Sequence, residues 1–162
     1  IILLWCKSRK RINFGSFFIR FLGGIPLNIE RLTDQLIIDE GLKLKPYRCS
    51  ADKLTIGVGR NIEEVGITEE EARYLLKNDI DMVTAQCLAE FPWFVKLSDV
   101  RKEAIVNLVF NMGLTTFKKF QKTIGYIEQG LFELAGTELL DSNYARQVGD
   151  RSVRVANMLA NG

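Results

Sequence analysis

The spacing of hydrophobic residues changes along this chain, and that change constrains the fold more than any other feature. Between positions 46 and 58 the residues Tyr47, Cys49, Leu54, Ile56 and Val58 alternate with others, which predicts two short strands joined by a turn at residues 50–53. Before and after this stretch hydrophobic residues recur every three or four positions, which predicts helices. We therefore expect an α+β protein with a small N-terminal sheet lobe, a long joining helix and a helical C-terminal lobe.

Residues with capping preferences mark the expected helices. The first covers residues 28–39 and stops at Gly41. Thr68 and Glu71 fit a capping box that opens the long helix. The later helices are expected from Ser98 to Gly113, over 116–129, over 131–140, and over 151–159 with Asp150 as its cap. The predicted buried positions of the two longest helices are Ala72, Leu75, Leu76, Ile80, Val83, Cys87, Val100, Ala104, Ile105, Leu108 and Val109.

Charge and cysteine content exclude several classes of function. Residues 1–26 hold five basic residues and no acidic one, which leaves 17 basic and 20 acidic residues, a net charge of −3, on the rest. That balance argues against nucleic-acid binding. Histidine is absent, and Cys6, Cys49 and Cys87 show no paired spacing. This argues against a disulfide framework, a zinc site or a histidine base, and we expect no metal and no organic cofactor.

Residues 1–26 are expected to lie outside the folded domain, which would span residues 27–162. One interpretation is a basic, aromatic arm at a membrane surface, since the apolar stretches are too short or too interrupted to span a bilayer. The other, which we favour, is translated upstream DNA. Gly23-Gly24 can be encoded by a ribosome-binding sequence, and Leu27 by an alternative start codon.

Glu40 is the candidate general acid. It lies at the end of the first expected helix, where the partial negative charge of the helix terminus disfavours an ionised carboxylate and favours the protonated form that an acid needs. In the hairpin, strand alternation places Thr55 on one face with Gly57 and Gly59, so that a bulky ligand can approach the backbone there. Cys49 can point the same way as Thr55.

These residues share one specific spacing: Glu40, eight residues, Cys49, five residues, Thr55, with a glycine directly after the glutamate. In this the chain resembles the phage-type lysozymes of glycoside hydrolase family 24, over residues 29–162. The runs 100–113 and 142–154 look like the central helix and the C-terminal segment of that family. The chain departs from the more familiar members at Cys49, where they carry Asp, and at Arg60, where many carry His.

The resemblance implies a lysozyme-like fold and a muramidase that hydrolyses the β-1,4 bond after N-acetylmuramic acid in bacterial peptidoglycan. Glu40 would be the acid, Thr55 would aim the water, and Cys49 would act as a base or as a nucleophile. Inversion is the default outcome, and Cys49 leaves retention open. Supporting residues would be Arg151, paired with Glu40 across a cleft between the lobes, and Gly57, Phe110, Asn111 and Thr123, beside the sugars.

The same resemblance implies a phage or prophage endolysin. Such a protein would be made in the host cytoplasm as a monomer and would reach the cell wall through a separate holin, without a membrane span of its own. Two alternatives stay open: a peptidoglycan-binding protein that has lost activity, and a decayed prophage reading frame. A helical interaction domain would leave the spacing of Glu40, Cys49 and Thr55 unexplained.

Overall fold

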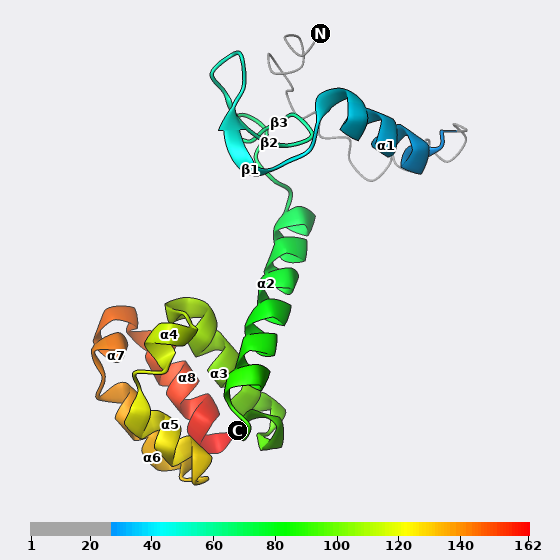
Figure 1. Cartoon of the computed structure of the whole chain (residues 1–162). Helices are drawn as coiled ribbons and strands as arrows, with labels where there is room; N and C mark the ends of the chain where they lie inside the picture. Colours follow the sequence, from blue (N-terminus) through cyan, green and yellow to red (C-terminus); the bar gives the residue numbers. More distant parts are fainter. Residues whose placement is uncertain (1–26) are drawn as a thin grey trace, which may run out of the picture. The chain divides into compact units, whose positions relative to one another are not determined.

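The chain forms two compact units, and the computed structural model describes residues 27–162 of it (Figure 1). Unit 1 ends at Glu71 and unit 2 runs from Ala72 to Gly162. The interpretations of residues 1–26 and of Cys6 lie outside the described residues. Unit 1 contains the sheet and unit 2 is helical, so the predicted α+β class with a lysozyme-like arrangement of elements is confirmed.

The described residues form eight α-helices, one 3-10 helix and a three-stranded antiparallel sheet. In chain order they are α1 (Ile29–Glu40), β1 (Lys43–Arg48), β2 (Leu54–Gly57), β3 (Arg60–Asn61), α2 (Glu69–Glu90), η3 (Phe94–Lys96), α3 (Asp99–Met112), α4 (Leu114–Phe117), α5 (Gln121–Glu128), α6 (Phe132–Leu140), α7 (Asn143–Val148) and α8 (Asp150–Asn161).

Helix α1 ends where Gly41 predicts, and it begins one residue after the expected start, because Asn28 is its cap. The side chain of Asn28 accepts a hydrogen bond from the Arg31 amide at 2.8 Å, which satisfies one of the unpaired donors of the first turn. Gly41 then ends the helix at φ 77°, and its N–H donates to the Ile37 carbonyl. Glu40 is therefore the last helical residue, immediately before the chain turns into β1.

The sheet places its second strand in the centre, in the order β1-β2-β3. Thr55 pairs with Tyr47 on one side and with Asn61 on the other. Residues directly opposite each other in paired strands project from the same face, so these three side chains share a face. Strand β3 was not predicted, because a strand of two residues is too short for alternation to show.

The start of α2 is tied to the sheet by polar contacts. The amide of Thr68 donates to the Glu71 carboxylate at 2.6 Å, and the Glu71 amide donates to the Thr68 hydroxyl at 3.0 Å, which confirms the predicted capping box. Arg60 on β3 donates to the same carboxylate and to the Gly66 carbonyl. The hydrogen bond from Thr68 and then the one from Arg60 lower the pKa of Glu71 to about 2.

The described hydrophobic core lies in unit 2. Its buried members on the two longest helices are Val83, Cys87, Ala104, Ile105, Leu108 and Val109, all of them predicted. Helices α6 and α8 pack closely, since a Cβ added at Gly136 would lie 2.9 Å from the Ala156 carbonyl oxygen. Burial raises the pKa of the Cys87 thiol to about 11, so this cysteine is a packing residue and not a reactive one.

Some predicted burial is wrong. The residues of α2 before Val83 that were expected to be buried are exposed. The buried hydrophobic residues of α2 begin only at Val83, and the earlier residues Leu76 and Ile80 line an open pocket. Val100 is also exposed. It lies in the first turn of α3, where Gly162 contacts it on one side. The positions that were predicted to be buried and are exposed are Ala72, Leu75, Leu76, Ile80 and Val100.

Two boundaries in the C-terminal region also differ from the prediction. Helix α7 was not expected, and Ser142 caps it by accepting from the Ala145 amide. Asp150 does not cap α8 through its side chain. The reason is that Gly149, at φ 56°, both ends α7 and precedes α8, so Asp150 is already the first helical residue.

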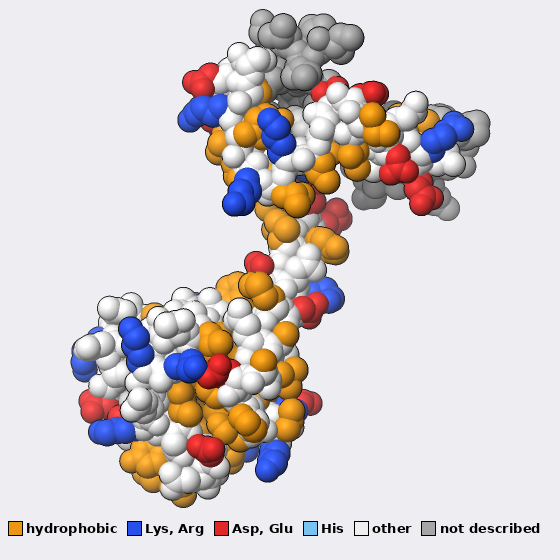
Figure 2. Space-filling view, in the orientation of Figure 1, with side chains coloured by type: hydrophobic (Ala, Val, Ile, Leu, Met, Phe, Trp, Pro, Cys, Tyr) orange, Lys and Arg blue, Asp and Glu red, His pale blue; other side chains and the backbone are white. Residues whose placement is uncertain are grey.

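Acidic and basic side chains are interspersed over unit 2 on the face seen in Figure 2. They do not gather there into one basic patch of the kind that binds a phosphate backbone. Within residues 27–162, no helix is both long enough and apolar enough to cross a membrane.

Candidate active site

Glu40 lies at the junction of α1 and β1, with a partly exposed side chain. Its position is fixed from two sides: Asn28 sets the start of the helix, and Gly41 turns the chain away directly after it. The carboxylate is thus attached to a defined helix end and is accessible to solvent. The position at the helix end is the one that the sequence predicts, and the role of general acid stays a prediction.

Thr55 is buried, with 1% of its surface exposed, in the centre of the sheet. Its hydroxyl donates to the Lys53 carbonyl at 2.9 Å, which fixes the orientation of the oxygen. The face that was predicted to be open is covered at Thr55 itself in this structure. The reason is the register, because Tyr47 and Asn61 on the two neighbouring strands share the face of Thr55.

Cys49 lies at the end of the same hairpin, in the turn that joins β1 to β2. Its amide donates to the Lys53 carbonyl at 3.0 Å and its carbonyl accepts from the Asp52 amide at 2.9 Å. Asp52 adopts φ 57°, which closes the turn. The Cys49 side chain is half-buried and disulfide-bonded. This corrects the expectation of an unpaired thiol at this position.

Gly57 ends β2 with a backbone that favours glycine. Its φ is 67°, and a Cβ built there would meet nothing within 4 Å. The space beside this residue is therefore open, in keeping with the predicted close approach of a ligand to the backbone. Cys49, in the turn, and Thr55 and Gly57, along β2, belong to one hairpin of unit 1, which also contains Glu40.

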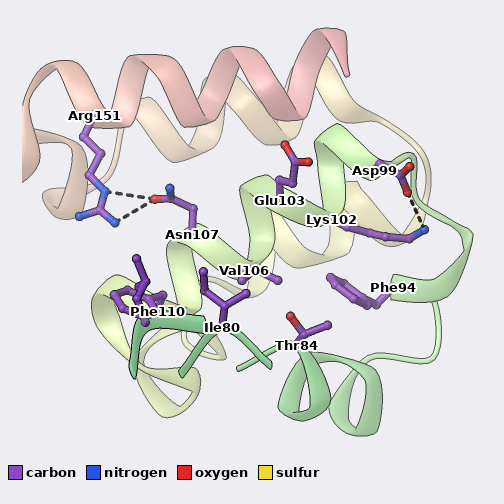
Figure 3. Close-up of a pocket in the computed structure, with 11 residues that line it drawn as sticks. Ile80, Thr84, Phe94, Asp99, Lys102, Glu103, Val106, Asn107, Phe110 and Arg151 are labelled. Carbon is purple, nitrogen blue, oxygen red and sulfur yellow. Dashed lines mark hydrogen bonds and ion pairs between the residues drawn. The ribbon is translucent and has the colours of Figure 1, made fainter. Parts of the chain in front are cut away.

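Arg151 lies in the first turn of α8 and is held by α3. Its Nε and Nη2 atoms donate to the Oδ1 atom of Asn107 at 3.1 and 2.9 Å (Figure 3). Both residues belong to unit 2 and line the same pocket. The pairing of Arg151 with Glu40 that the resemblance implies stays a prediction.

The pocket between α2 and α3 in unit 2 has a volume of about 630 Å³. Phe110 lies on its wall and is 43% exposed, which fits a residue that meets a ligand. Asn111, the next residue on α3, is exposed but is not one of the lining residues. Thr123 on α5 is buried, so the structure places it in the core and not on a ligand-facing surface. The lining residues are Leu76, Ile80, Thr84, Phe94, Asp99, Lys102, Glu103, Val106, Asn107, Phe110 and Arg151.

Asn107 is the residue of this region that sequence reasoning missed. It is a polar residue inside the apolar run of α3, between Val106 and Leu108. An amide in such a run needs a hydrogen-bond partner, and this was the available clue. Within residues 27–162 no group of three or more His, Cys, Asp or Glu side chains is placed to hold a metal ion.

Comparison with known proteins gives a consistent family. The family described as phage lysozyme matches residues 38–155. The chain is 35% identical over 117 residues to an endolysin of Acyrthosiphon pisum secondary endosymbiont phage 1, which covers 70% of this chain and 77% of that protein. It is 27% identical over 164 residues to a protein of Dictyostelium discoideum named probable T4-type lysozyme 1, which covers 83% of this chain and 96% of that protein.

Proposed function

The chain belongs to the phage lysozyme family, and from this we propose that it hydrolyses the β-1,4 bonds between N-acetylmuramic acid and N-acetylglucosamine in bacterial peptidoglycan. The observation that carries the proposal is the extent of the family match. Residues 38–155 include Glu40, Cys49 and Thr55 at the spacing of the motif, and Arg151 near the other end.

Glu40 is the proposed general acid. Cleavage of a glycosidic bond needs a proton on the leaving oxygen as the bond breaks. Glu40 is the carboxyl group at the C-terminal end of α1, and its side chain is partly exposed. It can thus reach a substrate from a fixed point of the backbone.

Thr55 is the proposed orienting group for the attacking water. Because its hydroxyl hydrogen is donated to the Lys53 carbonyl, the group would act on an attacking water through its oxygen, as an acceptor. An acceptor of this kind turns a water hydrogen towards itself and a lone pair of the water away from itself. The water lone pair is the part that attacks the sugar.

Cys49 can serve as a base or as a nucleophile only as a reduced thiol, since the thiolate is the reactive species. The disulfide-bonded form in this structure has no proton to exchange and no thiolate. The proposed catalytic role of Cys49 therefore requires that its disulfide bond is reduced when the chain acts on peptidoglycan. Export through a separate holin and lysis of the host belong to the same proposal.

The test is the release of new reducing ends from purified peptidoglycan by the whole chain, with and without a thiol reductant. Glu40→Gln removes the proton donor and keeps the shape of the side chain. We expect it to lower the rate by about 10² to 10⁴-fold, the range of general acid catalysis. Asp39→Asn is the matched control, because it neutralises the neighbouring exposed carboxylate of the same helix.

The two variants separate the outcomes. Activity that survives in Asp39→Asn and is lost in Glu40→Gln, with unchanged melting temperatures, supports the assignment. Equal activity of Glu40→Gln and the wild type would contradict it. Activity that appears only with reductant, and disappears in Cys49→Ser, would support the proposed role of the thiol.

A second candidate is a peptidoglycan-binding protein without turnover. Two observations favour it: in this structure the sulfur of Cys49 is part of a disulfide bond, and Thr55 is buried. Sedimentation of the folded chain with insoluble peptidoglycan, without release of reducing ends under either redox condition, would favour binding alone.

A further inference from the structure

The guanidinium of Arg151 is fixed by a single neutral acceptor on another helix. Two of its N–H groups, on Nε and Nη2, converge on the Oδ1 atom of Asn107, 44 positions away along the chain (Figure 3). An arginine side chain loses rotamer freedom when it is ordered, so an arrangement that holds it in one orientation has an entropic cost. A guanidinium has five N–H donors, and the Asn107 contact uses two of them.

Three charged residues of α3 line the same pocket as Arg151: Asp99, Lys102 and Glu103. Glu103, one turn before Asn107 on α3, lines the same pocket, and α2 contributes Leu76, Ile80 and Thr84, none of which titrates near neutral pH. On α7, burial raises the pKa of Tyr144, and the positive charge of Arg151 acts in the opposite direction. The charge of Arg151 is thus felt in its surroundings, and Asn107 does not neutralise it.

We propose that Asn107 is a positioning residue, which holds the Arg151 guanidinium in one orientation at the pocket and so makes its positive charge available to the reaction. The inference rests on the proposed muramidase function. It explains why a neutral amide stands here. An aspartate would accept the same two hydrogen bonds but would cancel the charge, and an alanine would leave the guanidinium without this constraint.

A double-mutant cycle on turnover of soluble, uncrosslinked peptidoglycan strands tests the proposal. We expect Arg151→Ala to lower kcat by about tenfold and Asn107→Ala by about fivefold, with KM little changed in both, since a misplaced group loses transition-state interactions first. If Asn107 acts through Arg151, the double variant equals Arg151→Ala within about twofold. Effects that multiply would show that Asn107 acts by itself and would overturn the proposal.

Asn107→Asp separates positioning and charge from simple packing. This variant keeps the size and both hydrogen bonds, so we expect an unchanged or higher melting temperature together with a kcat about fivefold lower than that of the wild type. A merely structural role would leave kcat unchanged in a variant that folds as well as the wild type. Wild-type kcat in Asn107→Asp would therefore overturn the proposal.

The chain offers a matched control on α7, where Arg146 donates to the Oδ1 atom of Asn143 on the exposed surface. Asn143→Ala releases an arginine in the same way, away from the pocket, and we expect wild-type kcat and KM. Failure of the proposed function gives a different result from failure of this inference. A wild-type chain without turnover overturns both, whereas wild-type turnover with multiplicative effects overturns only the role of Asn107.

Discussion

Units 1 and 2 differ in what their interiors are made of. Among residues 27–71 the buried side chains are two polar ones, Thr55 and Asn61, while every buried hydrophobic residue of the described chain lies at or after Val83. Yet unit 1 contains Glu40 and the Cys49 hairpin, the candidate catalytic groups. These candidate catalytic groups and the hydrophobic core thus lie in different parts of the sequence.

In residues 27–71 the stabilising contacts are backbone pairing, polar contacts and the disulfide bond of Cys49. The strands pair on both sides of Thr55, Lys53 forms an ion pair with Glu64 at 2.9 Å, and Arg60 reaches the capping box at the start of α2. Such polar contacts are individually worth about 1 kcal/mol or less. Substitutions in unit 1 should therefore affect activity more than stability, and substitutions in the core of unit 2 the reverse.

The largest expected effect on stability comes from replacing an isoleucine by alanine in unit 2, with the same replacement in unit 1 as its comparison. Ile105→Ala removes a fully buried side chain from α3 of unit 2, and we expect a loss of about 2 to 5 kcal/mol in the free energy of unfolding. Ile38→Ala on α1 of unit 1 removes the same atoms from a side chain that is 81% exposed, and we expect a change within about 0.5 kcal/mol. Urea unfolding measures both, and equal losses would break the comparison.

A pair of glycines sharpens the account of unit 2. In Gly136→Ala the new Cβ meets the Ala156 carbonyl oxygen at 2.9 Å, so α6 and α8 must separate, at a cost of about 1 to 3 kcal/mol. In Gly125→Ala the new Cβ meets only the Gln129 side chain at 4.0 Å, and the better helix former should stabilise α5 by about 0.5 to 1 kcal/mol. Melting temperatures that move in the same direction would show that close helix packing does not limit this unit.

The smallest effect concerns the polar contacts of unit 1. The pKa of Glu71 is about 2 in the folded chain against an ordinary 4.5, so its ionised form stabilises the fold above pH 4.5, and this contribution is lost as the pH falls towards 2. Glu71→Gln should destabilise by about 0.5 kcal/mol at pH 7, because the group is partly exposed and screened. It should also remove that part of the acid dependence of thermal unfolding. Glu70→Gln, on the exposed side of the same turn, should change neither.

Local features of the sequence predicted most of the fold. Asn28, Thr68 and Ser98 are helix caps because their side chains accept hydrogen bonds from amides three residues later. Such an interaction depends only on residues that are close together in the sequence. Gly41 and Gly113 end helices with positive φ for the same local reason. What was missed is short or non-local: β3 has two residues, and α7 has six.

The candidate site also has a part that could be predicted from nearby residues and a part that depends on contacts between distant ones. The spacing from Glu40 to Thr55 lies within one short stretch and could be recognised directly. The contact of Arg151 with Asn107 joins positions 44 apart, and the burial of Thr55 depends on both neighbouring strands. The disulfide bond of Cys49 was not predicted, because the cysteines show no paired spacing in the sequence.

The most direct test of the central claim is the chemical nature of the ends that the chain leaves on peptidoglycan. The products are reduced with borohydride, hydrolysed and separated, so that each new reducing sugar is recovered as its alcohol. Hydrolysis after N-acetylmuramic acid predicts muramitol, in amounts that rise with time for the wild type and not for Glu40→Gln. Glucosaminitol, anhydromuramic ends, or free amino groups without new reducing ends would contradict the account.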